Sequence, residues 1–216
     1  MSNAQMILHC GGKSATIEEV KAVPVPQATE TWFPVAHDRV IEMTTSAIRN
    51  AGYSIEREHF GLSNGGNRLF GTFDLSSEIV EGVSLSVGIR SSLDQKFAIG
   101  FCAGSRVFVC DNLAFSSERT VSRKHTRFGA DRYYNAICES VSTLTQFQRA
   151  EGDWIRNMDA RPISDEQAAD VILRSYESNV IGVQAIPAVL NEWRNPSLES
   201  QAPRTAWGLF NAFTYV

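Results

Sequence analysis

The chain has 216 residues, of which 43% are hydrophobic and 20% charged, so it is long enough to bury a core without disulfides or metals. Its formal net charge of −4 argues against a protein that binds nucleic acid over its whole surface. No apolar run approaches the roughly 18 residues of a membrane span and no signal peptide pattern is found, so we expect a cytoplasmic protein. Four cysteines without paired spacing fit reduced thiols in that compartment.

Residues 1–35 are predicted to form an N-terminal arm. An initial strand is expected at residues 6–8, and Thr16 with Glu19 matches a capping box, which predicts a short helix. Prolines end that helix. Residues 23–34 are expected to be extended, because a residue that precedes proline avoids the helical region.

Residues 36–160 are predicted to form an α+β core domain. The apolar spacing indicates a helix over residues 36–50, which a glycine closes. Alternating strands are expected at residues 53–60 and 68–75. The turn between them, at residues 63–67, has the sequence SNGGN and predicts a tight hairpin, since Asn and Gly tolerate positive φ.

The most β-rich stretch begins at Val83. Branched apolar residues alternate there with small or polar ones up to Arg90, as in a half-buried strand. Further strands are expected at residues 97–103, at 106–110 and within 113–123, after short turns. Such close spacing favours an antiparallel meander over βαβ units. The expected fold class is therefore α+β, with a meander sheet covered by a long helix.

From about Gly129 the apolar period becomes that of a long helix. Its predicted buried face comprises Tyr133, Ile137, Val141, Leu144, Phe147, Trp154 and Met158. A bend is expected at Gly152. Residues 161–216 are expected to form a helical C-terminal region that packs on the core.

Three helices are predicted in that C-terminal region. The first opens with a second capping box, Ser164 with Gln167. Its buried stripe is expected to comprise Ala168, Val171, Ile172 and Tyr176. Pro187 suits the first turn of the next helix, which reaches Trp193. Thr205 is expected to start the last helix, whose aromatic residues are Trp207, Phe210 and Phe213. Trp193, Trp207 and Phe210 are expected in the core.

The sequence contains no catalytic or cofactor-binding motif. The histidines are His9, His37, His59 and His125, and none has a neighbour at metal-ligand spacing. A nucleophile pair of Cys110 and His125 can be drawn, but Cys110 lies in an apolar run where thiols are protonated and inert. We therefore expect Cys102 and Cys110 to be buried and unpaired, and the protein to be a non-enzyme without metal or cofactor.

Cations cluster between the predicted sheet and the long helix. The cluster comprises Arg119, Arg123, Lys124, Arg127 and Arg132. A local stripe of this kind can bind phosphates although the total charge is negative. With His125 at its edge, it forms the candidate nucleic-acid-binding site, and a solvated strand end is the alternative interpretation. Phe108, Phe115 and Phe128 are candidates for base stacking, with core packing as their alternative.

Four strings carry a family resemblance: VGIRSS at 87–92, GSRVFVCDNLAF at 104–115, RKHTRF at 123–128 and TAWGLFNAFT at 205–214. Together they resemble the domain-of-unknown-function 932 family, whose members are phage- and plasmid-like proteins. The resemblance covers nearly the whole chain. It implies a mobile-element origin and no established activity, and members commonly continue beyond the last string.

The order of elements carries a second resemblance. A helix, the string GYSIE at 52–56, a meander and a long helix are similar to the core of phage and eukaryotic single-strand annealing proteins. Those proteins form rings that hold single-stranded DNA in a basic groove. The exposed sheet edges and the apolar end at residues 213–216 also predict a homo-oligomer.

Two functional hypotheses follow from these observations. The first is a non-enzymatic nucleic-acid-binding protein of a mobile element, which binds or anneals single-stranded DNA. The second is a protein-interaction module, such as an inhibitor of a host defence complex, since an acidic chain suits a basic partner. An enzyme of another type would need a closed pocket with convergent polar groups.

Overall fold

The structure, a computed structural model, describes residues 12–80, 83–105, 120–197 and 204–216. By its contacts the chain forms two compact units, Met1–Gln148 and Arg149–Val216. The division falls within the predicted long helix.

The first unit is organised around an antiparallel sheet. In chain order its strands are β1 Lys13–Ala15, β2 Ile55–Ser63, β3 Arg68–Val80, β4 Val83–Ser92, β5 Ile99–Ser105 and β6 Thr120–Arg123. Each strand pairs with the next along the chain, so the described residues form a six-stranded meander. The predicted α+β class is confirmed. The strands expected at residues 6–8 and 106–110 lie outside the described residues.

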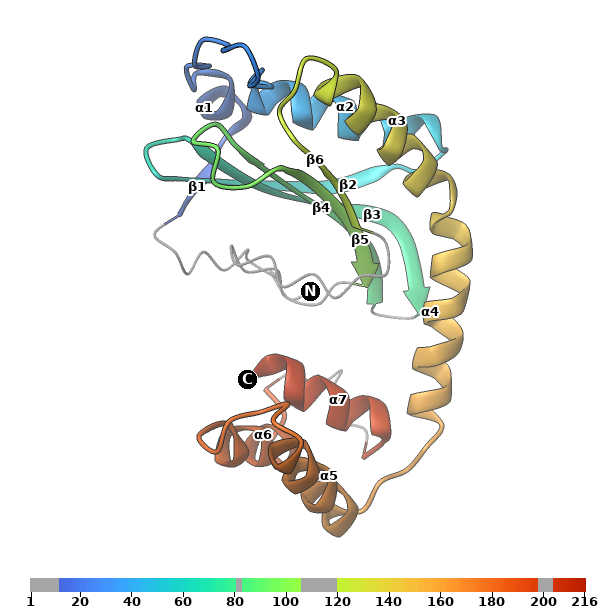
Figure 1. Ribbon diagram of the computed structural model, residues 1–216. Helices are drawn as coiled ribbons and strands as arrows, with labels where there is room; N and C mark the ends of the chain where they lie inside the picture. The colour runs from blue at the N-terminus through green and yellow to red at the C-terminus, as the bar shows by residue number, and fades with distance from the viewer. Residues whose placement is uncertain (1–11, 81–82, 106–119, 198–203) are drawn as a thin grey trace. The chain divides into compact units, whose positions relative to one another are not determined.

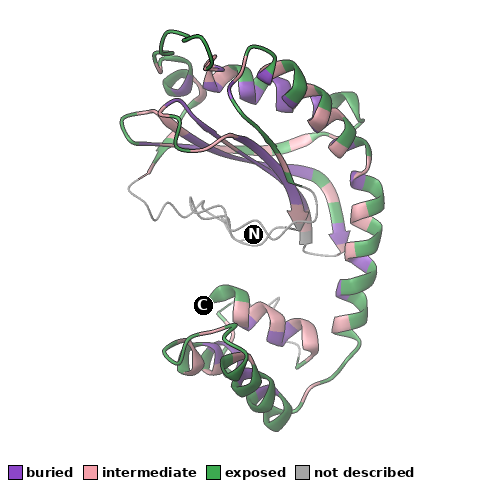
Figure 2. Ribbon diagram, viewed as in Figure 1, coloured by how far each residue is buried: buried purple, intermediate pink, exposed green. Residues whose placement is uncertain are grey.

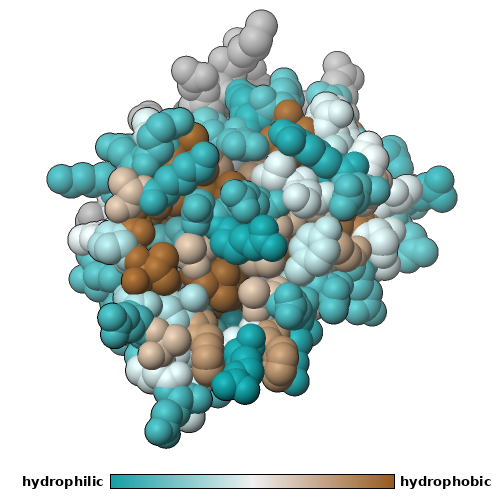
Figure 3. All heavy atoms as spheres, turned by 90° about the horizontal axis from the view of Figure 1, so that it is seen from above, coloured by the Kyte–Doolittle hydropathy of each residue, from teal (hydrophilic) through white to brown (hydrophobic). Residues whose placement is uncertain are grey.

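Helices cover one face of this sheet. The helices of the unit are α1 Ile17–Lys21, α2 His37–Asn50 and α3 Gly129–Ser142. Figure 1 shows α2 and α3 lying side by side across the same face, and Thr44 of α2 is 3.2 Å from the Tyr133 hydroxyl of α3. Figure 2 shows buried residues on the central strands and on the inner sides of both helices. Seen from above the view of Figure 1, the surface is largely hydrophilic and shows apolar residues in small groups (Figure 3).

The two faces of the sheet differ in composition. The row Phe73, Val87 and Ala103 is fully buried and apolar, as the alternating pattern predicts for the helix-covered face. Rows of the opposite face consist of Phe70, Arg90, Gly100 and Ser122, and of Thr72, Gly88, Cys102 and Thr120. This second face, which points away from α2 and α3, is therefore made mainly of small and polar residues.

The hairpin turn between β2 and β3 is confirmed. Asn64, Gly65 and Gly66 have φ values of 51°, 65° and 90°, all in the left-handed region. A Cβ on Gly66 would also lie 3.2 Å from a methyl group of Val23. By contrast, the described structure places no atom within 4 Å of a Cβ on Gly65.

Gly66→Val should destabilise the first unit by roughly 1–2 kcal/mol or more, because a β-carbon strains a positive φ and this one also meets Val23. Gly65→Asn is the matched control, since Asn tolerates the left-handed region. Urea unfolding measures both changes. Equal stability of Gly66→Val and wild type would contradict the turn geometry.

The predicted long helix is wrong in one respect: it is two helices. The chain leaves helical geometry at Thr143, where φ is −100° and ψ is 2°, and α4 then runs over Leu144–Asp159 through Gly152 without a break. The hydroxyls of Ser142 and Thr143 each donate to a carbonyl three residues earlier, at 2.7 Å. These side-chain bonds compete with the helical ladder and explain the break.

The second unit contains α5 Asp165–Glu177, α6 Ala185–Arg194 and α7 Ala206–Tyr215. Its core comprises Ala168, Ile172, Val189, Trp193, Leu209 and Ala212. The predicted stripe of α5 is too wide, because Val171 and Tyr176 are exposed while Ala168 and Ile172 are buried. Trp207 and Phe210 are half-buried and pack against Trp154. Among the described helices of either unit, none has the length and apolar character to cross a membrane.

Cys102 is a free, buried thiol, as predicted, whereas Cys110 lies outside the described residues. Burial raises the pKa of the Cys102 thiol. A thiol reagent should therefore modify Cys102 only after unfolding and should modify the half-buried Cys138 sooner. Mass spectrometry of the labelled peptides checks this order. Rapid native labelling of Cys102 would contradict its position in the core.

Candidate nucleic-acid interface

The candidate interface is centred on residues 123–128, here called the cationic loop, which connects β6 to α3. The loop turns tightly, since Thr126 N–H donates to the Lys124 carbonyl at 2.9 Å and Gly129 N–H to the Thr126 carbonyl at 2.8 Å. A Cβ on Gly129 would lie 2.5 Å from the Lys124 carbonyl oxygen, closer than real contacts allow. Only glycine therefore lets α3 begin so near the loop.

Four of the predicted cationic residues are exposed on this loop and on the first turn of α3. They are Arg123, Lys124, Arg127 and Arg132, whereas Arg119 lies outside the described residues. Asp131 is an acidic residue in the same turn of α3. The cluster therefore keeps an excess of positive charge at the N-terminal end of a 14-residue helix, an end that favours anions.

Aromatic residues lie beside these cations. The Arg127 guanidinium lies over the ring of Phe33, 5.6 Å from its centroid. Phe128 is 57% exposed, so the alternative of core packing is wrong for this residue. Phe108 and Phe115 lie outside the described residues. Phe33 and Trp32 were not among the predicted binding residues, although both lie just before Pro34 in a segment predicted to be extended.

His125 is buried beneath this surface and does not lie at its edge. It is 4% exposed, so we remove it from the set of residues that could touch a ligand. Its Nδ1 accepts the N–H of Val35 at 3.0 Å, and its carbonyl accepts the N–H of Phe33 at 2.9 Å. The Trp32 ring lies 6.2 Å from the imidazole. His125 therefore attaches residues 32–35 of the arm to the cationic loop.

His37 and His125 form a complementary buried pair. Because His125 Nδ1 accepts a hydrogen bond, the neutral ring carries its proton on Nε2. His37 Nε2 contacts the Gly66 carbonyl at 3.1 Å and must donate, which leaves His37 Nδ1 as an acceptor. His125 Nε2 and His37 Nδ1 are the two ring atoms without a direct partner in the structure. One is a donor and the other an acceptor.

Electrostatics keeps both rings neutral. Burial, and secondly the neighbouring His37, lowers the pKa of His125 to about 4. Burial also lowers the pKa of His37, against the opposing effects of the Gly66 and Asn67 carbonyls and of Asp38. A metal ion would need a bare Nε2 on His125, and the hydrogen bond from Val35 would then be lost. The pair therefore suits a structural role.

Comparisons with known proteins place the chain in a family. No curated protein and no solved structure was found to match it. The family model described as "Domain of unknown function (DUF932)" matches residues 27–216, which include the arm aromatics, the cationic loop and the helical unit. The chain therefore belongs to the DUF932 family.

Proposed function

We propose that the protein binds single-stranded nucleic acid through the cationic loop and the aromatic residues beside it, without catalysing a reaction. The observation that carries this proposal is the arrangement of Arg127 over Phe33, together with the exposure of Phe128, which follows Arg127 in the chain. Phosphates are held by guanidinium and ammonium groups, and unpaired bases stack on aromatic rings. A duplex offers phosphates but keeps its bases stacked inside, so single strands should bind more tightly.

The first test is binding of a labelled single strand and of the matching duplex, measured by fluorescence anisotropy over a range of salt concentrations. If the four exposed cations each neutralise one phosphate, log K should fall against log salt with a slope of roughly −3. Phe128→Leu should weaken single-strand binding by roughly tenfold and leave that slope unchanged, because stacking on an aromatic ring contributes about 1–3 kcal/mol per base. A folded protein that binds no single strand at about 50 mM salt would contradict the proposal.

A protein-interaction role is the second candidate, because the helical unit exposes apolar side chains. These are Val171, Leu173, Tyr176, Val180 and Val183. Exposed apolar groups of this kind often mark contact surfaces. An inhibitor of a host complex, a homo-oligomer and a mobile-element origin stay proposals from the sequence. Failure of DNA binding by the folded protein would favour this second candidate.

A further inference from the structure

One arginine on the second face of the sheet has no acidic partner among the described residues. Of the arginines that the described strands place on this face, Arg57 pairs with Asp74 at 3.4 Å and Arg68 with Asp94 at 2.7 Å. Arg90, near the end of β4, instead has its guanidinium over the ring of Phe97, 5.3 Å from the ring centroid. Within the described part of the chain, no ion pair or hydrogen bond of its guanidinium is found. Its charge is therefore available to a ligand.

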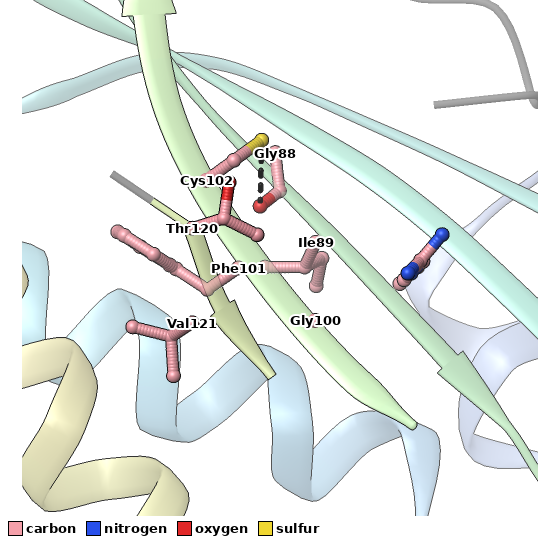
Figure 4. A pocket seen from close by; sticks show the side chains of 8 residues that line it. Gly88, Ile89, Gly100, Phe101, Cys102, Thr120 and Val121 are labelled. Atoms are coloured by element: carbon pink, nitrogen blue, oxygen red, sulfur yellow. Dashed lines mark hydrogen bonds between the residues drawn. The ribbon is translucent and has the colours of Figure 1, made fainter. Parts of the chain in front are cut away.

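A pocket of about 170 Å³ opens beside Arg90. On this face its walls are Gly88, Arg90, Gly100, Cys102 and Thr120, contributed by β4, β5 and β6 (Figure 4). A Cβ on Gly100 would lie 2.9 Å from Cγ and 3.0 Å from Nε of Arg90. The glycine thus leaves room for the arginine side chain to lie flat across β5, with its guanidinium over Phe97.

The chemistry of the walls narrows the ligand class. A guanidinium donates two parallel hydrogen bonds to a carboxylate or a phosphate, and the Thr120 hydroxyl is a further polar group on the same wall. The Cys102 thiol lies 3.8 Å from the Gly88 carbonyl and is protonated, so it offers no nucleophile. The volume suffices for a small group, since a cavity of about 150 Å³ can hold benzene.

We propose that this pocket binds the oxyanion of a small ligand, a phosphate or carboxylate group, with Arg90 as its cation. The pocket is separate from the cationic loop. Arg123 pairs with Ile99 and therefore belongs to the helix-covered face, whereas Arg90 pairs with Gly100 on the second face. One guanidinium should give a dissociation constant of roughly millimolar for a simple anion.

The test is an NMR titration of the full chain with inorganic phosphate and with acetate, against chloride at equal ionic strength. The backbone amide signals of Gly88, Gly100 and Thr120 should shift and saturate with phosphate or acetate. They should not respond in Arg90→Gln, and Arg90→Lys should retain only a weakened response. Gly104→Ala is the control substitution in the neighbouring strand β5. It should keep the wild-type response, because its Cβ would meet no described atom within 4 Å.

Each outcome decides the proposal. Shifts equal to those with chloride, or shifts that persist in Arg90→Gln, would overturn it. If Arg90→Gln does not fold, Arg90→Lys decides, and a response as strong as that of wild type would overturn the proposal. Two further titrations distinguish the possible sources of the bound anion. A single strand without terminal phosphate that shifts the same amides identifies backbone phosphate, whereas a response confined to free phosphate or acetate identifies a small molecule.

Discussion

Replacing Arg123, Lys124 and Arg127 together by alanine should weaken single-strand binding by roughly a hundredfold or more at about 50 mM salt. Each lost phosphate contact removes about 0.7 from the slope of log K against log salt, so the slope should change from roughly −3 to roughly −1. Binding to all sequences should weaken alike, since phosphate contacts carry no sequence information. The fold should stay intact, because all three side chains are exposed.

The matched control removes the same charge from elsewhere on the surface. Arg39, Arg156 and Arg174 are exposed, and each forms an ion pair with an acid three or four residues away on its own helix. Their replacement by alanine changes the net charge equally and should leave the slope close to that of the wild type. If both triple variants lose affinity to the same extent, the protein responds to net charge and has no binding site at the cationic loop.

Local signals predicted the secondary structure well, because their partners lie close together in sequence. The Thr16–Glu19 and Ser164–Gln167 capping boxes both form, with side-chain bonds that close within three residues. The turn at Gly65 and Gly66 follows from the same local chemistry. The break at Thr143 was missed, because a threonine in an amphipathic pattern is compatible with helix until its hydroxyl bonds a carbonyl.

The candidate site was predicted only in part, because some of its contacts join residues that are far apart in the sequence. Cations beyond the end of an alternating strand are exposed in most folds, so Arg123 and Arg127 could be placed from the sequence. The partners of the cationic loop lie about 90 residues earlier, as in the bond from Val35 to His125. No local pattern specifies such a contact. Burial of His125 depends on it, and so does the position of Phe33 under Arg127.

Acidification should lower the free energy of unfolding of the first unit, because His125 is buried as a neutral ring. A neutral imidazole is favoured in the folded state, where its pKa is about 4, against an ordinary value near 6.5 in the unfolded chain. The stability that depends on the neutral ring is complete above pH 6.5 and is lost as the pH falls from 6.5 towards 4, because the unfolded chain then binds the proton more readily. The loss should reach at most roughly 3 kcal/mol, from about 1.36 kcal/mol per pKa unit.

His125→Asn isolates this effect from the other groups that titrate in acid, including His37. The asparagine oxygen can accept the N–H of Val35 as Nδ1 does, but it does not ionise in this range. Urea unfolding at a series of pH values, followed by amide signals of Met1–Gln148, gives the stability of the first unit alone. Wild type should be the more stable protein at pH 7, and its advantage should shrink or reverse towards pH 4. A constant difference would mean that His125 titrates alike in both states and does not hold the arm. Because the arm carries Phe33 and the folded protein protonates His125 only near pH 4, single-strand binding should weaken near pH 4 in wild type and not in the variant.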